Sequence, residues 1–308
     1  MIIITTYHIN IYSPDSEIRK KYLSETIRSI DNQRIKDLIH IIIDDGSNDD
    51  TFKELKRKYA NSINRYVFKR EKHPAEILTS TNARNFALDL CLESTSTKNI
   101  NLLNQKYITF IDSDDVVINL NKRLNFLENN NVDFLFTDAL IFFDNIDKSF
   151  VWSGINNNIS RVYNTFWVKG KMPYPTMTWS INFLRELKTF NNKKYNKGIF
   201  DSKIGCGEDV DVALSSLECA RELNYKIGYL PEITAGYRIH NLSLTCIRNQ
   251  KDRKREENAV LIRHFGKYHT AILHIKRFLI RPECYIEFFI KIKNAFKKKL
   301  SKTDFIKS

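Results

Sequence analysis

The sequence predicts an α/β fold with a mostly parallel central sheet flanked by helices. Short apolar runs rich in β-branched residues at 2–6, 39–43 and 107–111 are typical of buried strands, and helical patterns lie between them. Strands that alternate with helices in this way favour a parallel sheet. Acidic residues directly follow two of these strands, and such sheets bind ligands beyond the carboxyl ends of their strands. The same pattern therefore predicts where a site should lie.

The first part of the chain is a continuous series of these elements. Leu23, Ile27 and Ile30 recur at helical spacing and predict a helix at residues 22–30. After the strand at 39–43 we expect, in order, a capped helix at 49–59, a strand at 65–69 and a helix at 82–91. The polar stretch at residues 94–106 predicts a loop that leads into the strand at 107–111.

The pattern changes after residue 120. The expected elements are a strand at 132–137, a helix at 180–187, a helix opened by the acidic segment 206–212, a strand near 226–229 and then a Pro-Glu loop. We therefore divide the chain into residues 1–118, residues 119–248 and a basic helical C-terminal extension at 249–308.

Composition favours a folded protein of a reducing compartment. With 308 residues the chain can form a full core. Its five cysteines are widely spread and contain no CxxC pair, so neither a disulfide framework nor a thiolate zinc site is indicated. The first ten residues, MIIITTYHIN, lack a basic region and a cleavage site, and no apolar run reaches the roughly 18 to 20 residues that span a bilayer. We expect a cytoplasmic location.

The net charge of +13 suggests an anionic partner, and the excess is largest at the C-terminus. Ten Lys and Arg residues stand against three acidic residues from Ala271 to the end. Within this segment, five apolar residues recur at helical spacing among lysines: Tyr285, Phe288, Phe289, Ile292 and Phe296. Such a helix can lie on an anionic membrane surface, which suggests peripheral association with the inner face of the cytoplasmic membrane through residues 271–308. The alternative, that the aromatic stripe packs on the rest of the protein, stays open.

Two groups of carboxylates follow predicted strands. Asp112, Asp114 and Asp115 lie within four positions, and two unit charges about 4 Å apart repel by roughly 4 kcal/mol at an effective dielectric near 20. Such a cluster requires a cation, unless one of these residues only caps the next helix. Asp44 and Asp45 end the strand IIIDD in the same way. The shared placement favours a shared ligand over two unrelated caps.

Several motifs occur in an order that resembles glycosyltransferase family 2. They are TTYH (5–8), LSETIRSIDNQ (23–33), IIIDDGSNDDT (41–51), ARN (83–85), YITFIDSDD (107–115), GEDVDVAL (207–214) and YRIHNLS (237–243). Together they cover about residues 1–245, and although a single DxD is weak, the ordered series is specific. The resemblance implies the GT-A fold, which has a Rossmann-like, mostly parallel sheet flanked by helices.

The resemblance also implies a divalent metal, Mn²⁺ or Mg²⁺, beside the strand that ends in DSDD. Asp114 would be the metal ligand, Asp112 would contact the ribose or share the metal, and His240 would complete the metal or diphosphate site. Hard cations bind carboxylate oxygens and, for Mn²⁺, an imidazole. For His240 the alternative is an ordinary surface or core histidine.

The nucleotide contacts follow from the same resemblance. Asp45 would accept a hydrogen bond from the base, with Thr6 and Tyr7 as the neighbouring wall, and Arg84 would lie near the nucleotide. The alternatives are an Asx-turn for Asp45 and a structural ion pair for Arg84.

On the acceptor side the resemblance implies that Asp209 is the general base, a role typically worth about 10² to 10⁴ in rate. Glu208 would bind or orient the acceptor. The alternative for this pair is a negatively charged helix N-terminus that complements the helix dipole. Trp179 is a candidate aromatic platform for an acceptor sugar, with core packing as the alternative.

Some positions depart from the family pattern. His8 stands where Asn is usual, Thr5 where Pro is usual, and Thr79 where a Gly often precedes ARN. The QxxRW motif of processive synthases is absent, which favours the addition of a single sugar.

The sequence thus predicts a metal-dependent, inverting glycosyltransferase. It would move one hexose or N-acetylhexosamine, from a UDP-sugar, to a glycan or lipid-linked oligosaccharide of a bacterial surface polysaccharide such as lipopolysaccharide or capsule. Residues 1–118 would bind the nucleotide-sugar, and residues 119–248 would bind the acceptor and supply the base.

Three other classes of function are alternatives to this prediction. A catalytically inactive nucleotide-binding relative is one alternative. A Mg²⁺ phosphohydrolase is another, although its usual nucleophilic Asp is missing from the first strand, which ends TTYH. A nucleic-acid-binding protein would present basic residues where the strand ends are acidic.

Overall fold

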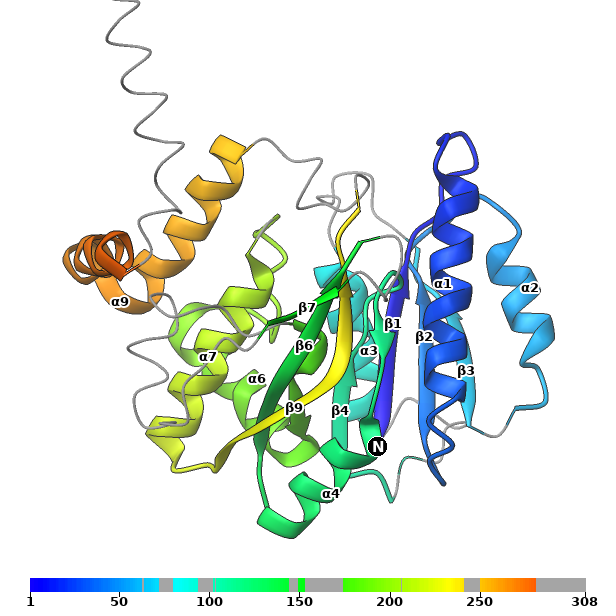
Figure 1. Ribbon diagram of the computed structural model, residues 1–308, viewed down its shortest axis with the longest axis horizontal. Coiled ribbons are helices and arrows are strands. Elements are labelled where there is room, and N and C mark those ends of the chain that lie inside the picture. The colour runs from blue at the N-terminus through cyan, green and yellow to red at the C-terminus, as the bar shows by residue number, and fades with distance from the viewer. Residues whose placement is uncertain are drawn as a thin grey trace, which may run out of the picture.

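One continuous β-sheet flanked by helices organises the protein (Figure 1). The computed structural model describes residues 1–62, 64–71, 80–93, 102, 104–143, 149–152, 174–205, 207–240 and 250–280. The strands are β1 (Ile2–Tyr7), β2 (Ile39–Asp44), β3 (Arg65–Lys69), β4 (Tyr107–Phe110), β5 (Val116–Val117), β6 (Phe134–Phe142), β7 (Ser149–Trp152), β8 (Thr178–Ser180) and β9 (Ile227–Arg238). The helices are α1 (Ser16–Asp31), α2 (Thr51–Lys58), α3 (Thr81–Leu92), α4 (Leu120–Asn130), the 3-10 turn η2 (Tyr174–Thr176), α6 (Ile181–Tyr195), α7 (Glu208–Leu223) and α9 (Gln250–Ile280). The strands lie in the order β3-β2-β1-β4-β8-β6-β9-β5, with β7 paired to β6.

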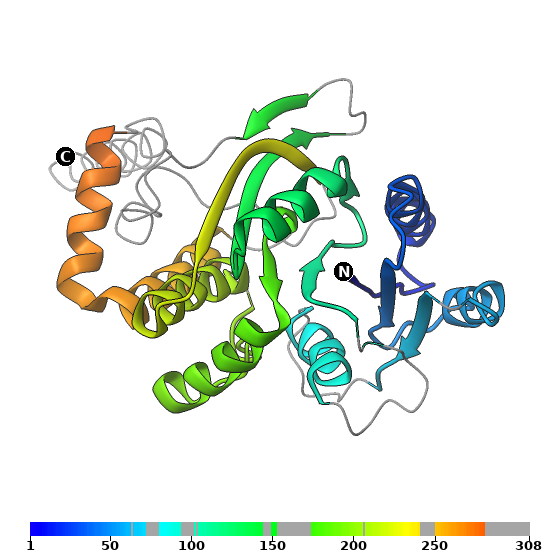
Figure 2. The same cartoon turned by 90° about the horizontal axis from the view of Figure 1, so that it is seen from below.

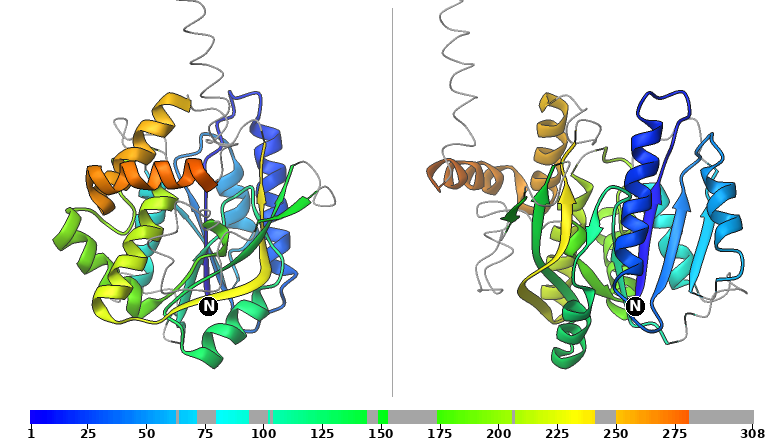
Figure 3. Two further views of the ribbon diagram at one scale, coloured as in Figure 1. Left: turned by 60° about the vertical axis from the view of Figure 1, so that its left-hand side comes forward. Right: turned by 45° about the vertical axis from the view of Figure 1, so that its right-hand side comes forward.

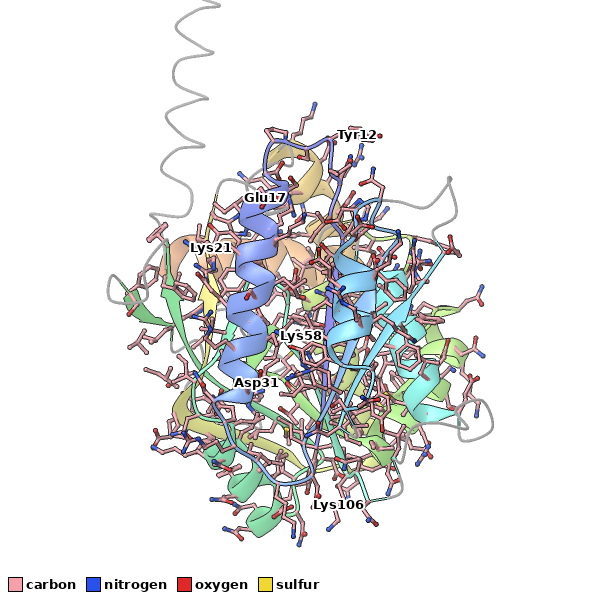
Figure 4. The ribbon with its side chains drawn as sticks, turned by 90° about the vertical axis from the view of Figure 1, so that its right-hand side faces the viewer. Tyr12, Glu17, Lys21, Asp31, Lys58 and Lys106 are labelled. Carbon is pink, nitrogen blue, oxygen red and sulfur yellow. The ribbon has the colours of Figure 1, made fainter. Side chains whose placement is uncertain are left out.

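The first half of the sheet is parallel, as predicted. β1 pairs with both β2 and β4, and β2 pairs with β3. Every residue of β1 and β2 is buried, because α1 and α2 cover one face and α3 covers the other (Figure 2). Tyr12, just beyond β1, and Lys106, just before β4, therefore lie at opposite ends of the molecule (Figure 4). The carboxyl ends of β1, β2 and β4 meet at one edge.

The second half of the sheet is mixed. β8 runs antiparallel to its neighbours β4 and β6, whereas β6 and β9 pair in parallel and curve side by side (Figures 1 and 3). Helices α6 and α7 pack together behind these strands, and their apolar residues join the same core as those of α3 and β4. This core connects the two halves of the sheet into one body.

The strand β9 is longer than the sequence predicts. The Pro-Glu pair was expected to form a loop, but Pro231 lies inside β9. A proline cannot donate to the strand ladder, so it is tolerated where the pairing is irregular. The register between β6 and β9 shifts at Thr137 and Asp138, opposite this segment. The expected loop is therefore an irregular stretch of one continuous strand.

Helix α9 begins at the predicted C-terminal extension but is part of the core. Val260, Leu261 and Leu273 are at most 2% exposed and belong to the main apolar cluster. The helix bends at Gly266, whose φ of 73° and ψ of 162° are not helical. The amphipathic stripe predicted beyond residue 280 and the family departure at Thr79 lie outside the described residues. In the described ranges, every helix is too short or too polar to cross a membrane.

Candidate active site

The predicted donor and acceptor carboxylates meet at Arg84. This arginine lies on α3, and its Nη2 donates to Asp112 Oδ1 at 2.6 Å while its Nη1 lies 3.4 Å from Glu208 Oε1. Its side chain is 4% exposed, whereas those of Asp112 and Glu208 are 30% and 15% exposed. We call Arg84, Asp112 and Glu208 the donor-site cluster. Residues 124 positions apart are thus brought to one place.

Burial changes the acidity of the two carboxylates in this cluster. Burial raises the pKa of Glu208 to about 7, because the opposing charge of Arg84 only partly offsets it and the charge of Asp209 adds to it. Burial also raises the pKa of Asp112, again opposed by Arg84 and reinforced by Asp114 and Asp209. A carboxyl with a pKa near neutrality can hold or release a proton at physiological pH, which suits acid-base chemistry.

The neighbouring ring of Tyr174 positions Arg84. The guanidinium lies 4.2 Å from the centre of this ring, which η2 holds in place. Arg123 supports η2, since its Nη2 donates to the Pro175 carbonyl at 3.0 Å. The Tyr174 hydroxyl and Arg84 Nε are buried and lack a hydrogen-bond partner among the described residues. Sequence reasoning did not find Tyr174 or Arg123, because neither belongs to a motif with an acidic or metal-binding pattern.

The two predicted metal ligands lie together. His240 Nε2 is 2.7 Å from Asp114 Oδ2, and their side chains are 6% and 30% exposed. Within the described ranges no group of three or more His, Cys, Asp and Glu side chains could hold a metal ion by itself. A pair of protein ligands nevertheless fits Mg²⁺ or Mn²⁺, which use one or two carboxylates, and for Mn²⁺ an imidazole, together with substrate phosphates and water.

Helix α1 and the end of β9 hold this pair in place. Tyr22 lies between two residues of the YRIH motif, with its ring 5.0 Å from the His240 ring and 4.2 Å from the Arg238 guanidinium. Arg238 donates to the Asp114 carbonyl at 2.8 Å and to Glu25 at 2.6 Å. Arg238 belongs to the YRIHNLS motif, but the sequence suggested no role for it. Its contacts show that it positions the loop that carries Asp114.

Asp45 lies at the end of β2 in a network of its own. Arg70 Nε donates to Asp45 Oδ1 at 2.7 Å, and His8 Nδ1 lies 2.9 Å from the Asp45 carbonyl. The Asx-turn considered for Asp45 is formed by its neighbour instead, because the Ser47 amide donates to Asp44 Oδ1 at 2.7 Å. Arg70 had no signal in the sequence beyond its charge.

The predicted wall of the nucleotide site is buried beside Asp45. Thr6 and Tyr7 are 7% and 3% exposed, and the Asp45 amide donates to the Tyr7 carbonyl at 2.8 Å. The Tyr7 hydroxyl and Asp44 Oδ2 have no hydrogen-bond partner among the residues that the structure describes. Burial, followed by the charge of Asp44, raises the pKa of the Tyr7 hydroxyl.

Asp209 follows Glu208 in the first turn of α7. The turn before it is made by Gly207, whose φ of 90° is disfavoured for any residue with a Cβ. Asp209 Oδ1 accepts a hydrogen bond from the Val210 amide at 2.8 Å. Arg84 pairs with Glu208, and the charge of the adjacent Asp209 is near enough to raise the pKa of both Glu208 and Asp112.

Trp179 requires a correction, because it lies in the core and not in the site. It is 0% exposed, stacks on Phe134 with ring centres 5.5 Å apart, and donates from Nε1 to Ser216 Oγ at 2.9 Å. A side chain enclosed in this way offers no platform for a sugar. The core-packing alternative is confirmed.

Comparison with known proteins places the chain in a family. The model of "Glycosyl transferase family 2" matches residues 2–188. An uncharacterized glycosyltransferase of Methanocaldococcus jannaschii, MJ1057, is 26% identical over 237 residues, which cover 75% of this chain and 71% of that protein.

Two solved structures are similar in fold. S. aureus TarS 1–349 in complex with UDP-GlcNAc has a TM-score of 0.62 at 16% identity, covering 96% of this chain and 77% of that one. The mannosyltransferase PcManGT from Pyrobaculum calidifontis, in complex with GDP-Man and Mn²⁺, has a TM-score of 0.50 at 14% identity, covering 90% and 69%. The chain therefore belongs to glycosyltransferase family 2 and is a glycosyltransferase with the GT-A fold.

Proposed function

We propose that this protein is a metal-dependent, inverting glycosyltransferase that moves a single sugar from a UDP-sugar to a glycan or lipid-linked acceptor of a bacterial surface polysaccharide. The observation that carries the proposal is the donor-site cluster, in which Arg84 joins Asp112, beside the metal pair, to Glu208, beside the predicted base. This arrangement puts the groups needed for the leaving diphosphate next to those needed for the attacking hydroxyl.

The metal fits the donor side. Asp114 and His240 would hold it, and it would stabilise the charge that develops on the diphosphate as a Lewis acid. Asp112 would lie at the ribose or share the metal, and Asp45, Thr6 and Tyr7 would enclose the base. The UDP-GlcNAc in the TarS structure supports a uridine donor, and the GDP-Man in PcManGT is the guanosine alternative.

The acceptor side would supply the base. Asp209 takes the proton from the acceptor hydroxyl while its oxygen forms a bond to the anomeric carbon. The bond from that carbon to the phosphate oxygen breaks, and the electron pair leaves with the nucleoside diphosphate. Attack from the opposite face inverts the anomeric configuration. Glu208, held by Arg84, orients the acceptor.

The phosphohydrolase alternative lacks its nucleophile. In that reading an Asp should end β1, but β1 ends at Tyr7, and the next residue is His8. A catalytically inactive relative would have no use for the Glu208–Asp209 pair opposite the metal pair. The transferase reading uses all of these groups.

We place the protein in the cytoplasm, with peripheral contact to an anionic membrane through residues 271–308. The support is the basic excess in that segment. Sedimentation with anionic liposomes, with and without residues 281–308, tests the contact. Equal binding by both forms would contradict a contact made through residues 281–308.

The function itself is tested by a panel of nucleotide-sugars, scored by thermal unfolding with Mn²⁺, with Mg²⁺ and with EDTA. A ligand present at about 100 times its Kd stabilises the folded protein by roughly 2.7 kcal/mol. We expect one UDP-sugar to stabilise the protein in a metal-dependent way, and acceptor glycans to release UDP from it. Absence of a shift with every nucleotide, with or without metal, would contradict the proposal.

A further inference from the structure

Helix α9 contacts the helix that begins with Glu208 and Asp209. Arg263 Nη1 on α9 donates to Asp211 Oδ1 at 3.0 Å, and His264 Nε2 lies 3.1 Å from the same oxygen. His264 Nδ1 lies 3.2 Å from Glu218 Oε2, two turns further along α7. The side chains of Asp211 and His264 are 0% exposed. Two neighbouring residues of α9 thus contact one face of α7.

The other oxygen of Asp211 is also occupied. Lys197 donates to Asp211 Oδ2 and, at 2.8 Å, to Ser215 Oγ, while Arg263 Nη2 reaches Asp201 at 2.7 Å. Although burial alone would raise the pKa of Asp211, bonding to His264 and the charge of Lys197 lower it to about 2. We call Asp211, Glu218, Lys197, Arg263 and His264 the α7–α9 cluster.

His264 contacts two acidic residues of α7 at once. One ring nitrogen faces a carboxylate oxygen of Asp211, and the other faces a carboxylate oxygen of Glu218. The Tyr195 hydroxyl lies 3.2 Å from Nδ1 and donates to Glu218 Oε2. Lys194 from α6 also reaches Glu218, at 2.7 Å. The cations from α6, α9 and the loop at Lys197 therefore balance the acids that α7 presents to them.

A second contact lies at the turn just before the catalytic pair. A Cβ built on Gly207 would be 3.5 Å from Glu257 Cγ, so α9 lies directly against this turn. The Asp211 amide closes the first turn of α7 by donating to the Gly207 carbonyl at 2.9 Å. Contacts with α9 therefore lie on both sides of Glu208 and Asp209, at Gly207 and at Asp211.

We propose that Arg263 and His264 are positioning residues that fix the first turn of α7 and so aim Glu208 and Asp209 at the acceptor. This inference rests on the proposed function of those two carboxylates. It makes α9, beyond the segment matched by the family model, a required part of the catalytic unit. Neither residue touches substrate in this scheme; each acts through Asp211.

The test compares R263Q and H264Q with H269Q, a matched control on the exposed part of α9. Misplacing a reacting group by about 1 Å can cost up to 10²-fold in rate, so we expect kcat to fall at least about 10-fold in R263Q and H264Q. The KM for the nucleotide-sugar should stay within about two-fold, because the donor side is untouched. H269Q should resemble the wild type in both constants.

Hydrogen exchange supplies a readout that does not need a substrate. Peptides that cover residues 207–215 should exchange faster in R263Q and H264Q than in H269Q. If the two variants loosened only α9, exchange would rise in residues 250–280 and not in 207–215, and the proposal would be overturned. Unchanged kcat at a temperature where both variants are folded would overturn it as well.

The two proposals fail in different ways. If the wild type transfers no sugar from any donor, the proposed function fails, and exchange in residues 207–215 still decides whether α9 fixes the turn. If H264Q does not fold, R263Q alone tests the positioning role. The Arg263 side chain is 29% exposed, so its replacement leaves a gap that water can partly fill.

Discussion

The donor-site cluster and the α7–α9 cluster both pair buried or partly buried carboxylates with basic side chains, but they differ in completeness. In the donor-site cluster the carboxylates are partly exposed, and Arg84 Nε and the nearby Tyr174 hydroxyl have no hydrogen-bond partner in the described part of the chain. In the α7–α9 cluster both oxygens of the fully buried Asp211 accept bonds from cations. Buried polar groups are normally satisfied, so an incomplete cluster indicates a place for a ligand and a complete one indicates structure.

The pKa values of two glutamates on α7, Glu208 and Glu218, reflect this difference. Burial raises the pKa of Glu208 to about 7, since among the described residues only the cation Arg84 pairs with it, and at a long distance of 3.4 Å. At Glu218 burial acts in the same direction, but bonds from His264, Lys194 and Tyr195 lower the pKa to about 2. The number of hydrogen bonds to the charged form, and not burial alone, therefore separates the pKa of Glu208 from that of Glu218.

The largest effect should come from the proposed base, Asp209. Asp209→Asn should lower kcat by about 10² to 10⁴ with donor binding intact, because the amide cannot accept the acceptor proton. Glu208→Gln keeps a hydrogen-bond acceptor for Arg84 and should cost less. Single-turnover rates with a saturating donor measure both. A larger loss in Glu208→Gln would exchange the roles of the two residues.

The next effect concerns Arg84. Arg84→Gln leaves Asp112 and Glu208 close together without their shared cation, and breaking a buried pair costs about 3 to 5 kcal/mol of unfolding free energy. Urea denaturation measures the loss. The matched control is Lys122→Gln, which removes an exposed pair with Glu232 and should cost less than about 1 kcal/mol. Equal losses would contradict the distinction between a buried and a surface cation.

Replacing the two glutamates should change the free energy of unfolding at pH 8 in opposite directions. Glu208 has a folded pKa of about 7, above the ordinary glutamate value of 4.5, so the folded state binds more protons and stability falls as pH rises between these values. Glu208→Gln should therefore be more stable than the wild type at pH 8, by at most about 3 kcal/mol, and close to it near pH 4.5.

Glu218 provides the matched opposite case. Its folded pKa of about 2 lies below 4.5, so its stabilisation is present above pH 4.5 and is lost as pH falls towards 2. Glu218→Gln should therefore be less stable than the wild type at pH 8. Thermal unfolding of both variants between pH 4 and 8 measures the signs. Equal signs at pH 8 would contradict the comparison of the two clusters.

The smallest effect on activity should be at Trp179. Trp179→Phe removes part of a buried ring and its bond to Ser216, which should cost about 1 to 3 kcal/mol in stability. The KM for the acceptor should not change. A rise in that KM without loss of stability would indicate that Trp179 does contact the acceptor.

Much of the fold could be predicted from the sequence, because its signals are local. The runs at β1, β2 and β4 are continuous and apolar, and their carboxyl ends carry Asp45, Asp112 and Asp114 in short motifs. The strand β9 was only partly predicted, because Pro231 is a loop signal whose effect is absorbed by an irregular register. Local patterns do not reveal which pairing tolerates a proline.

The missed parts of the site are contacts between distant residues. Arg238 reaches Glu25 across 213 positions, and Arg123 reaches the Pro175 carbonyl across 52. His264 carries no motif and becomes informative only when Asp211 is placed beside it. Such pairings depend on tertiary packing, which one sequence does not specify by periodicity or spacing.

The most direct measurement is the affinity of UDP with and without Mn²⁺, by calorimetric titration of the wild type, Asp114→Ala, His240→Ala and Arg263→Gln. We expect Mn²⁺ to tighten UDP binding at least about 10-fold in the wild type and in Arg263→Gln, and to have no effect in Asp114→Ala. His240→Ala should show a reduced effect. Metal-linked UDP binding that persists in Asp114→Ala would contradict the assignment of Asp114 as the metal ligand of the donor site.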